Sequence, residues 1–180
     1  MKKTIWRILL VLIITIAIGA YFFTRSATAF SEKSRYFFIP SDSAQMSFVI
    51  QNLEAQGILK SVSIFKWLAG RTDYAKKVKP GRYKIQNGMS QSAVLRLLIN
   101  GSQDPVKLVI NKFRTKEDFA RFAGRQIESD SMQIMQFLQS PDSLKRFGVD
   151  TNTAITLIIP NTYTFFWNTN ASKLFKKLHN

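Results

Sequence analysis

The feature that most constrains this chain is an apolar run that begins within its first ten residues. Residues 8–23 are apolar apart from one threonine. Three basic residues and no acidic residue precede this run: Lys2, Lys3 and Arg7. Sixteen helical residues measure about 24 Å, whereas the hydrocarbon core of a bilayer is about 30 Å thick, so residues 4–6 are expected to complete a crossing. The sequence therefore predicts a transmembrane helix over residues 4–23, in contact with inner-membrane lipid.

The charges around this run predict the side of the membrane on which the rest of the chain lies. Basic residues ahead of a span keep the N-terminus in the cytoplasm, so we predict a single-pass protein of the inner (plasma) membrane with the bulk of the chain on the periplasmic side. A signal peptide cleaved after Ala29 is the alternative, because residues 27–29 are small. The length of the run favours a retained anchor. Either route exports residues 30–180.

Composition restricts the partners and the chemistry. The chain carries 26 Lys and Arg residues against 11 Asp and Glu, a formal net charge of +15. Such an excess favours a polyanionic partner, and export makes anionic lipid or an anionic cell wall a better candidate than nucleic acid, so no nucleic-acid partner is expected. The absence of cysteine excludes thiolate metal sites, disulfides and a thiol nucleophile.

Residues 30–102 are predicted to form a small α+β unit. Apolar residues alternate in the two predicted strands and recur at helical spacing in the segments between and after them. Ser41 or Ser43 is the expected N-cap of the first helix and Ser90 that of the third. The predicted elements are a strand over 35–39, helices over 46–56 and 62–69, a strand over 82–85 and a helix over 91–100.

Residues 103–180 are predicted to begin a second α+β domain. Thr115 is expected to cap its first helix, and the second helix is expected to start near Ser129 or Ser131. The predicted elements are a strand over 106–110, two helices up to Pro141, a strand over 154–159 and a helix over 171–178. Because these elements are too few to enclose a sheet, we expect the 180 residues to belong to a longer protein.

The titratable residues predict no catalytic group within the chain. The single histidine, His179, lies at the end of the sequence, and no metal-ligand spacing or phosphate-binding motif is present. Glu117 and Asp118 fall in the first turn of a helix, where negative charge offsets the helix dipole. Glu128 and Asp130 fall between helices, which is again a capping position. We therefore predict no catalytic residue, no metal and no cofactor in these 180 residues.

A cluster of aromatic residues gives the only candidate substrate site. Sugar rings stack their apolar faces on aromatic side chains, and their hydroxyls bind Asn, Thr and Tyr. The alternative is that Phe165 and Trp167 alternate into a core as strand residues do. The candidate substrate-binding residues are Pro160, Asn161, Thr162, Tyr163 and Trp167.

Three stretches, in this order and spacing, together resemble a known family. The first comprises Ile-x-x-Leu-x-x-x-Gly-Ile at 50–58, Val-x-Pro-Gly-x-Tyr at 78–83, Gly-Met-Ser at 88–90 and Leu-x-x-x-Gly at 97–101. The second is the strand-to-helix junction over 109–115, and the third is Ile-Pro-Asn-Thr-Tyr at 159–163. These stretches resemble the endolytic murein transglycosylase (YceG-like) family. The third stretch, followed by Trp-Asn-Thr at 167–169, is most similar to members from Bacteroidota.

The resemblance implies a fold, an activity and partners. It implies an anchor over 1–29, a LysM-like unit over 30–102 and the incomplete start of a YceG-like catalytic domain over 103–180. The implied enzyme is a lytic transglycosylase (a lyase) that cleaves MurNAc–GlcNAc bonds in nascent peptidoglycan strands. It leaves 1,6-anhydroMurNAc ends and terminates glycan elongation, without metal or cofactor. The implied partners are peptidoglycan and the cell-wall synthesis machinery.

The sequence departs from the family pattern at two positions. Many members carry Glu-Gly where this chain has Ile155-Thr156, and Pro-Glu-Gly where it has residues 111–113 (Asn-Lys-Phe). The family's catalytic glutamate belongs to a later helix with an Ala-Ser-x-(Ile/Val)-Glu-Lys-Glu pattern, which we expect after Asn180. The 180-residue chain by itself is then expected to be inactive. A non-catalytic, membrane-tethered peptidoglycan-binding or scaffold module is the alternative.

Overall fold

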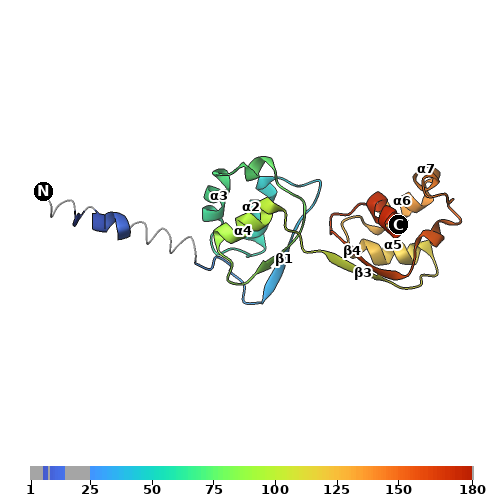
Figure 1. Cartoon of the computed structure of the whole chain (residues 1–180), viewed down its shortest axis with the longest axis horizontal. Coiled ribbons are helices and arrows are strands. Elements are labelled where there is room, and N and C mark those ends of the chain that lie inside the picture. The colour runs from blue at the N-terminus through green and yellow to red at the C-terminus, as the bar shows by residue number, and fades with distance from the viewer. Residues whose placement is uncertain (1–5, 8, 15–24, 180) are drawn as a thin grey trace. The chain divides into compact units, whose positions relative to one another are not determined.

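The computed structural model describes residues 6, 7, 9–14 and 25–179 (Figure 1). Residues 6, 7 and 9–14 are helical, but most of the transmembrane helix predicted over 4–23 lies outside the described residues. Within the described ranges, no helix has both the length and the apolar character that a bilayer crossing requires.

The chain divides into two compact units. Unit 1 comprises residues up to Ile39, Ser43–Lys79 and Tyr83–Ser102, and unit 2 comprises Pro40–Asp42, Pro80–Arg82 and Gln103–Asn180. Each unit has its own hydrophobic core. Both are mixtures of helices and short strands, which confirms the predicted α+β class for the described part of the chain.

Unit 1 is built on a two-stranded sheet with helices inserted between and after its strands. Strands β1 and β2 pair with each other. The elements are β1 (Ser34–Ile39), α2 (Met46–Ala55), α3 (Val62–Gly70), the 3₁₀ helix η1 (Asp73–Lys76), β2 (Gly81–Gln86) and α4 (Gln91–Asn100). The predicted strands and helices of this unit are therefore confirmed.

The core of unit 1 follows from the period of two in its strands. Phe37 and Ile39 of β1 and Tyr83 and Ile85 of β2 are fully buried, while the residues between them are half-buried or exposed. Helices α2, α3 and α4 cover this apolar face with side chains at helical spacing. The fully buried helical residues are Val49, Leu53, Phe65, Ala69, Val94 and Leu98.

The helix caps of unit 1 confirm one prediction and correct another. Ser90 caps α4, because its Oγ accepts a hydrogen bond from the Ala93 N–H at 3.3 Å. The prediction of Ser41 or Ser43 as the cap of α2 was wrong. The Gln45 N–H donates to the Ser43 carbonyl at 2.7 Å, so a tight turn delays the helix, and Gln45 is the N-cap without a side-chain hydrogen bond.

Unit 2 contains one antiparallel strand pair and four α-helices among its described residues. Strands β3 and β4 pair with Val106 opposite Phe165 and Ile110 opposite Asn161. The elements are β3 (Val106–Ile110), α5 (Lys116–Gly124), α6 (Ser131–Gln139), α7 (Pro141–Lys145), the 3₁₀ helix η2 (Ala154–Leu157), β4 (Asn161–Phe165) and α8 (Ala171–His179).

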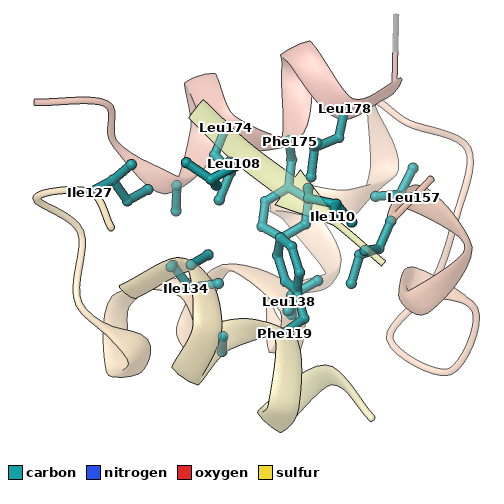
Figure 2. Packing of buried hydrophobic residues seen from close by; sticks show 14 of the residues in the cluster. Leu108, Ile110, Phe119, Ile127, Ile134, Leu138, Leu157, Leu174, Phe175 and Leu178 are labelled. Atoms are coloured by element: carbon teal, nitrogen blue, oxygen red, sulfur yellow. The ribbon is translucent and has the colours of Figure 1, made fainter. Parts of the chain in front are cut away.

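The helices of unit 2 cover one face of this strand pair. In Figure 2, Leu108 and Ile110 of β3 lie among side chains of α5, α6 and α8, and all of these residues are buried. Helix α8 presents Ala171, Leu174, Phe175 and Leu178 at the spacing of an amphipathic helix. The opposite face of the pair is open to solvent, with Val109 54% exposed.

One sequence prediction in unit 2 was wrong, and another was confirmed. Residues 154–159 do not form a strand: Ala154–Leu157 is a 3₁₀ helix, and the strand begins after Pro160. The Asp150 carboxylate accepts hydrogen bonds from the N–H groups of Asn152 and Thr153, both at 2.8 Å, and such local bonds compete with an extended backbone. The second helix begins at Ser131, as predicted, and Asp130, which the sequence placed at a capping position, caps it in a capping box with Gln133.

Candidate functional site

The predicted substrate-binding residues lie at the two ends of strand β4. Pro160 precedes the strand, Asn161, Thr162 and Tyr163 lie in its first half, and Trp167 follows its last residue. Seven residues of extended chain span roughly 23 Å. The structure therefore does not bring Pro160 and Trp167 into one hollow.

The polar groups at the start of β4 are engaged within the strand and its approach. The Tyr163 hydroxyl donates to the Ile159 carbonyl at 3.1 Å, and its ring packs against the core of unit 2. Asn161 Oδ1 accepts a hydrogen bond from the Thr162 N–H at 2.7 Å. These contacts fix the backbone where the chain enters the strand. Substrate contact by Asn161, Thr162 and Tyr163 stays a prediction.

A shallow hollow lies beside Pro160. It has a volume of about 290 Å³, and its other lining residues are Lys112, Phe113, Ile155 and Ile158. Lys112 and Ile155 are the two positions at which this chain departs from the acidic residues of the family pattern. The two departures are 43 positions apart in the sequence, from 112 to 155, yet they share one hollow. The lining of this hollow is therefore apolar apart from the side chain of Lys112.

A second hollow lies at the other end of β4, between the strand and α8. Its volume is about 410 Å³. The Lys177 ammonium donates to the Thr164 carbonyl and lies 5.2 Å from the centroid of the Phe165 ring. Phe166, which is 55% exposed, supplies an aromatic wall. With Lys173 also lining it, this hollow combines aromatic surface with two ammonium groups.

Trp167 lines a third hollow, which is larger and more polar. This hollow of about 710 Å³ lies within unit 2, and its polar lining includes Glu128, Gln133, Asn168 and Asn170. The Glu128 N–H donates to the Trp167 carbonyl at 2.6 Å, which fixes the backbone beside the indole. Side chains that offer amide and carboxylate groups around a half-buried indole suit a ligand rich in hydroxyl groups.

The carboxyl groups of unit 2 act as hydrogen-bond acceptors. A hydrogen bond from Thr115, followed by one from Arg121, holds the pKa of Asp118 below its ordinary value, and hydrogen bonds from Thr153 lower the pKa of Asp150. The Glu128 carboxylate accepts hydrogen bonds from the N–H and hydroxyl of Ser41, at 2.5 and 2.6 Å. A general acid in glycan cleavage needs a raised pKa, the opposite of what Asp118 and Asp150 have.

The titratable side chains of the described residues also form no metal-binding cluster. Within residues 6, 7, 9–14 and 25–179, no group of three or more His, Cys, Asp and Glu side chains is arranged to hold a metal ion. His179 is exposed, and its ring lies 5.5 Å from that of Phe147.

Sequence reasoning did not include in the candidate site the hollow lined by Lys173 and Lys177, here called the basic hollow. Phe166 follows Phe165 in the aromatic cluster, but its role depends on Lys173 and Lys177, which α8 places at i and i+4 on one face. The signal was present in the sequence. The apolar positions of α8 already fix which of its lysines flank the buried face.

Comparison with known proteins identifies the class. Residues 37–180 match the family model described as "YceG-like family". The chain therefore belongs to the YceG-like family, whose members are generally endolytic transglycosylases. No curated protein matches the sequence.

One solved structure is among the matches. It is a crystal structure of a YceG-like protein from Listeria monocytogenes, with 18% sequence identity and a TM-score of 0.44. The match covers 83% of this chain and 53% of that one, so the chain spans about half the length of that protein.

Proposed function

We propose that the protein is a membrane-anchored endolytic lytic transglycosylase that cuts nascent peptidoglycan. It cleaves MurNAc–GlcNAc bonds within growing glycan strands and thereby ends their elongation. Membership of the YceG-like family over residues 37–180 carries this proposal. The basic composition of the chain suits a wall polymer that carries carboxylates.

The proposed reaction consumes no water. A glutamic acid protonates the glycosidic oxygen as the bond from C1 of MurNAc breaks. The 6-hydroxyl of the same MurNAc attacks C1, and its proton returns to the glutamate carboxylate. One bond breaks and one forms, so the products are a free GlcNAc hydroxyl and a 1,6-anhydroMurNAc end. Metal and organic cofactors have no part in this scheme.

We assign the catalytic glutamate to a segment outside these 180 residues. The Asp118 carboxyl accepts a hydrogen bond from the Arg121 guanidinium, and the Asp150 carboxyl accepts hydrogen bonds from the N–H groups of Asn152 and Thr153, which favours the ionised form of both. These residues are suited to fixing local structure. Units 1 and 2 then contribute binding and position, with unit 1 as a LysM-like module.

Unit 2 supplies the proposed glycan contacts from the end of β4. Phe166 and Trp167 are consecutive and line different hollows, one basic and one rich in amides. A saccharide can stack on either ring, and the lysines of the basic hollow can pair with the peptide carboxylates of the wall. Pro160 and the motif that follows it position this strand.

The anchor defines where the enzyme works. Residues 4–23 cross the inner membrane in this proposal, and the remainder lies on the periplasmic side. An anchored enzyme meets strands while they are still close to the synthetic machinery, which suits termination of growth.

The activity is tested with purified peptidoglycan. The chain extended by the rest of its reading frame is incubated with intact glycan strands, and the products are separated and weighed by mass spectrometry. We expect muropeptides with anhydro ends that are 18 Da lighter than hydrolysis products, roughly the mass of one water. Residues 1–180 alone are expected to release none. Hydrolysed ends, or no cleavage by the extended chain with its predicted Glu-Lys-Glu helix intact, would contradict the proposal and favour a binding module.

A further inference from the structure

The outward face of α3 combines an aromatic residue, an aliphatic residue and a cation. Trp67 is 55% exposed and Ile64 is 41% exposed, while Phe65 and Leu68 of the same helix are buried. Among the large hydrophobic residues of unit 1 described from Arg25 onward, Trp67 is the most exposed. The Arg71 guanidinium carbon lies 4.3 Å from the centroid of the Trp67 ring. Ile64, Trp67 and Arg71 are spaced by three and four, so they share one face.

The charged residues within α3 and its immediate flanks are basic, and the nearest acidic residues in the sequence are Glu54 and Asp73. Lys60, Lys66 and Arg71 are exposed. A helix with exposed Trp and basic residues is typical of an element that lies on a membrane surface. Trp is enriched at the headgroup level of bilayers, and each basic residue close to anionic lipid adds attraction.

Backbone hydrogen bonds connect the start of α3 to the segment that directly follows the apolar run. The Lys60 N–H donates to the Ala27 carbonyl at 2.8 Å, and the Ala29 N–H donates to the Ile58 carbonyl at 3.0 Å. Thr28 forms an antiparallel bridge with Leu59. The residues that lead into α3 are thus held beside the first residues after the predicted anchor.

The length of the chain restricts how far α3 can lie from the end of the apolar run. Ala27 is four residue steps after position 23, and these steps span at most about 13 Å when the chain is fully extended. Trp67 lies five residues beyond the first residue of α3, or about 8 Å along the helix axis. A membrane crossing that ends at position 23 therefore leaves Trp67 within reach of the headgroup region on the exported side.

We propose that α3 docks on the anionic phospholipid surface of the membrane that residues 4–23 cross. Trp67 and Ile64 enter the headgroup boundary, and Lys60, Lys66 and Arg71 pair with lipid phosphates. This inference rests on the proposed membrane anchor. The contact fixes unit 1 against the bilayer instead of leaving it on a free tether.

The test uses the full chain in vesicles with a fluorescent label. Because the chain has no cysteine, Ser63→Cys on the exposed side of α3 gives one labelling site, and Lys84→Cys on β2 gives the reference site. The vesicles carry a headgroup quencher and consist either of phosphatidylcholine alone or of a 3:1 mixture with phosphatidylglycerol. Flotation of the vesicles reports the anchor separately from the label.

We expect the label at position 63 to be quenched at least twofold more than the label at 84 in the anionic vesicles. Trp67→Ala combined with Lys66→Glu should remove at least half of that difference, and 0.5 M salt should reduce it. Arg96→Glu, at an exposed position of α4, serves as the matched charge control and should leave it unchanged.

The outcomes separate the two proposals. Chain that floats with the vesicles but shows equal quenching at 63 and 84 overturns α3 docking and leaves the anchor intact. Equal quenching at 63 in neutral and anionic vesicles overturns the assignment to anionic lipid. If the fluorescence of the label at 63 changes only when soluble glycan is added, and not with lipid, the exposed face of α3 binds sugar instead. Failure of the chain to float overturns both the anchor and the docking.

Discussion

The Phe175 ring lies parallel to the Phe137 ring, with 5.0 Å between centroids and 4° between planes. Phe175 also lies 5.8 Å from Phe119, so α8 contacts both α5 and α6 through one side chain. Figure 2 shows Phe119 and Phe175 pointing toward each other in the middle of the core of unit 2. Helix α8 is therefore an integral part of this unit.

Removal of this ring should destabilise unit 2 strongly. Phe175 is fully buried, so Phe175→Ala loses the packed ring and leaves a cavity at a cost of about 3–5 kcal/mol. Denaturant unfolding of the detergent-solubilised chain, followed by Trp167 fluorescence, measures the change. Met132→Ala is the control, because Met132 is 68% exposed and its loss should cost under about 0.5 kcal/mol. Equal effects of the two substitutions would show that α8 does not pack as described.

Two glycines should respond to alanine with opposite signs. A Cβ at Gly124, the last residue of α5, would lie 2.5 Å from the backbone nitrogen of Ser131 and 2.9 Å from the carbonyl carbon of Asp130. Gly124→Ala should therefore destabilise unit 2 by about 1–3 kcal/mol. Nothing lies within 4 Å of a Cβ at Gly70 in α3, so Gly70→Ala should stabilise unit 1 by about 0.5–1 kcal/mol. Thermal unfolding monitored by circular dichroism distinguishes the signs, and stabilisation by both substitutions would contradict the close approach of α5 and α6.

Unit 1 should lose stability at alkaline pH. Burial raises the pKa of Tyr83 to about 12, and burial followed by the nearby Tyr83 raises the pKa of Tyr74 as well. A phenol in the unfolded chain ionises near pH 10, so the free energy of unfolding is unaffected below pH 10 and falls as pH rises from about 10 to 12. Trp67 fluorescence during denaturant unfolding at several pH values measures this slope.

The variant Tyr83→Phe separates the two contributions of this side chain. It removes the hydrogen bond from the Tyr83 hydroxyl to the Lys79 carbonyl, 2.8 Å long, and should cost about 1 kcal/mol at neutral pH. The variant should also make the fall in the free energy of unfolding at alkaline pH less steep. An unfolding free energy that stays constant through pH 11 in the unchanged chain would rule out the raised pKa.

The hollows at the end of β4 should bind soluble glycan fragments through their aromatic walls. Phe166→Ala and Trp167→Ala should each weaken binding of a muropeptide oligomer by roughly threefold to tenfold, because the loss of one stacked ring is worth about 1 kcal/mol. Isothermal titration calorimetry with the solubilised chain measures the affinity. Thr162→Ala tests the residues predicted from the sequence motif, and Met132→Ala is the surface control. A larger loss for Thr162→Ala than for either aromatic variant would move the site to the start of the strand.

The sequence was sufficient for those elements in which one pattern dominates. Alternating residues such as Phe37 and Ile39 predicted a strand, and the apolar positions of α8 predicted its buried face. It was insufficient over 154–159, where apolar residues suit a strand and a 3₁₀ helix equally. The chain turns there instead of extending, because the Asp150 carboxylate accepts hydrogen bonds from the N–H groups of the residues that follow it.

The candidate site was harder to predict because it depends on packing between distant segments. The sequence identified Lys112 and Ile155 as separate departures from a family pattern, and only the fold places them in one hollow. It also grouped Pro160 with Trp167, because proximity along the chain suggested proximity in space. An extended strand separates such residues, and consecutive residues such as Phe166 and Trp167 face different hollows.

The export of residues 25–179 is the condition on which a wall-directed function depends, and cysteine accessibility in living cells tests it. The chain without cysteine is expressed with Gln126→Cys, an exposed position in unit 2, or with Lys3→Cys ahead of the apolar run. A maleimide that cannot cross the inner membrane is then added to cells whose outer layers are permeable to it. Immediate labelling at 126, with position 3 protected until the cells are lysed, is the predicted result. Protection at 126 until lysis would place the folded units in the cytoplasm and contradict the proposed function.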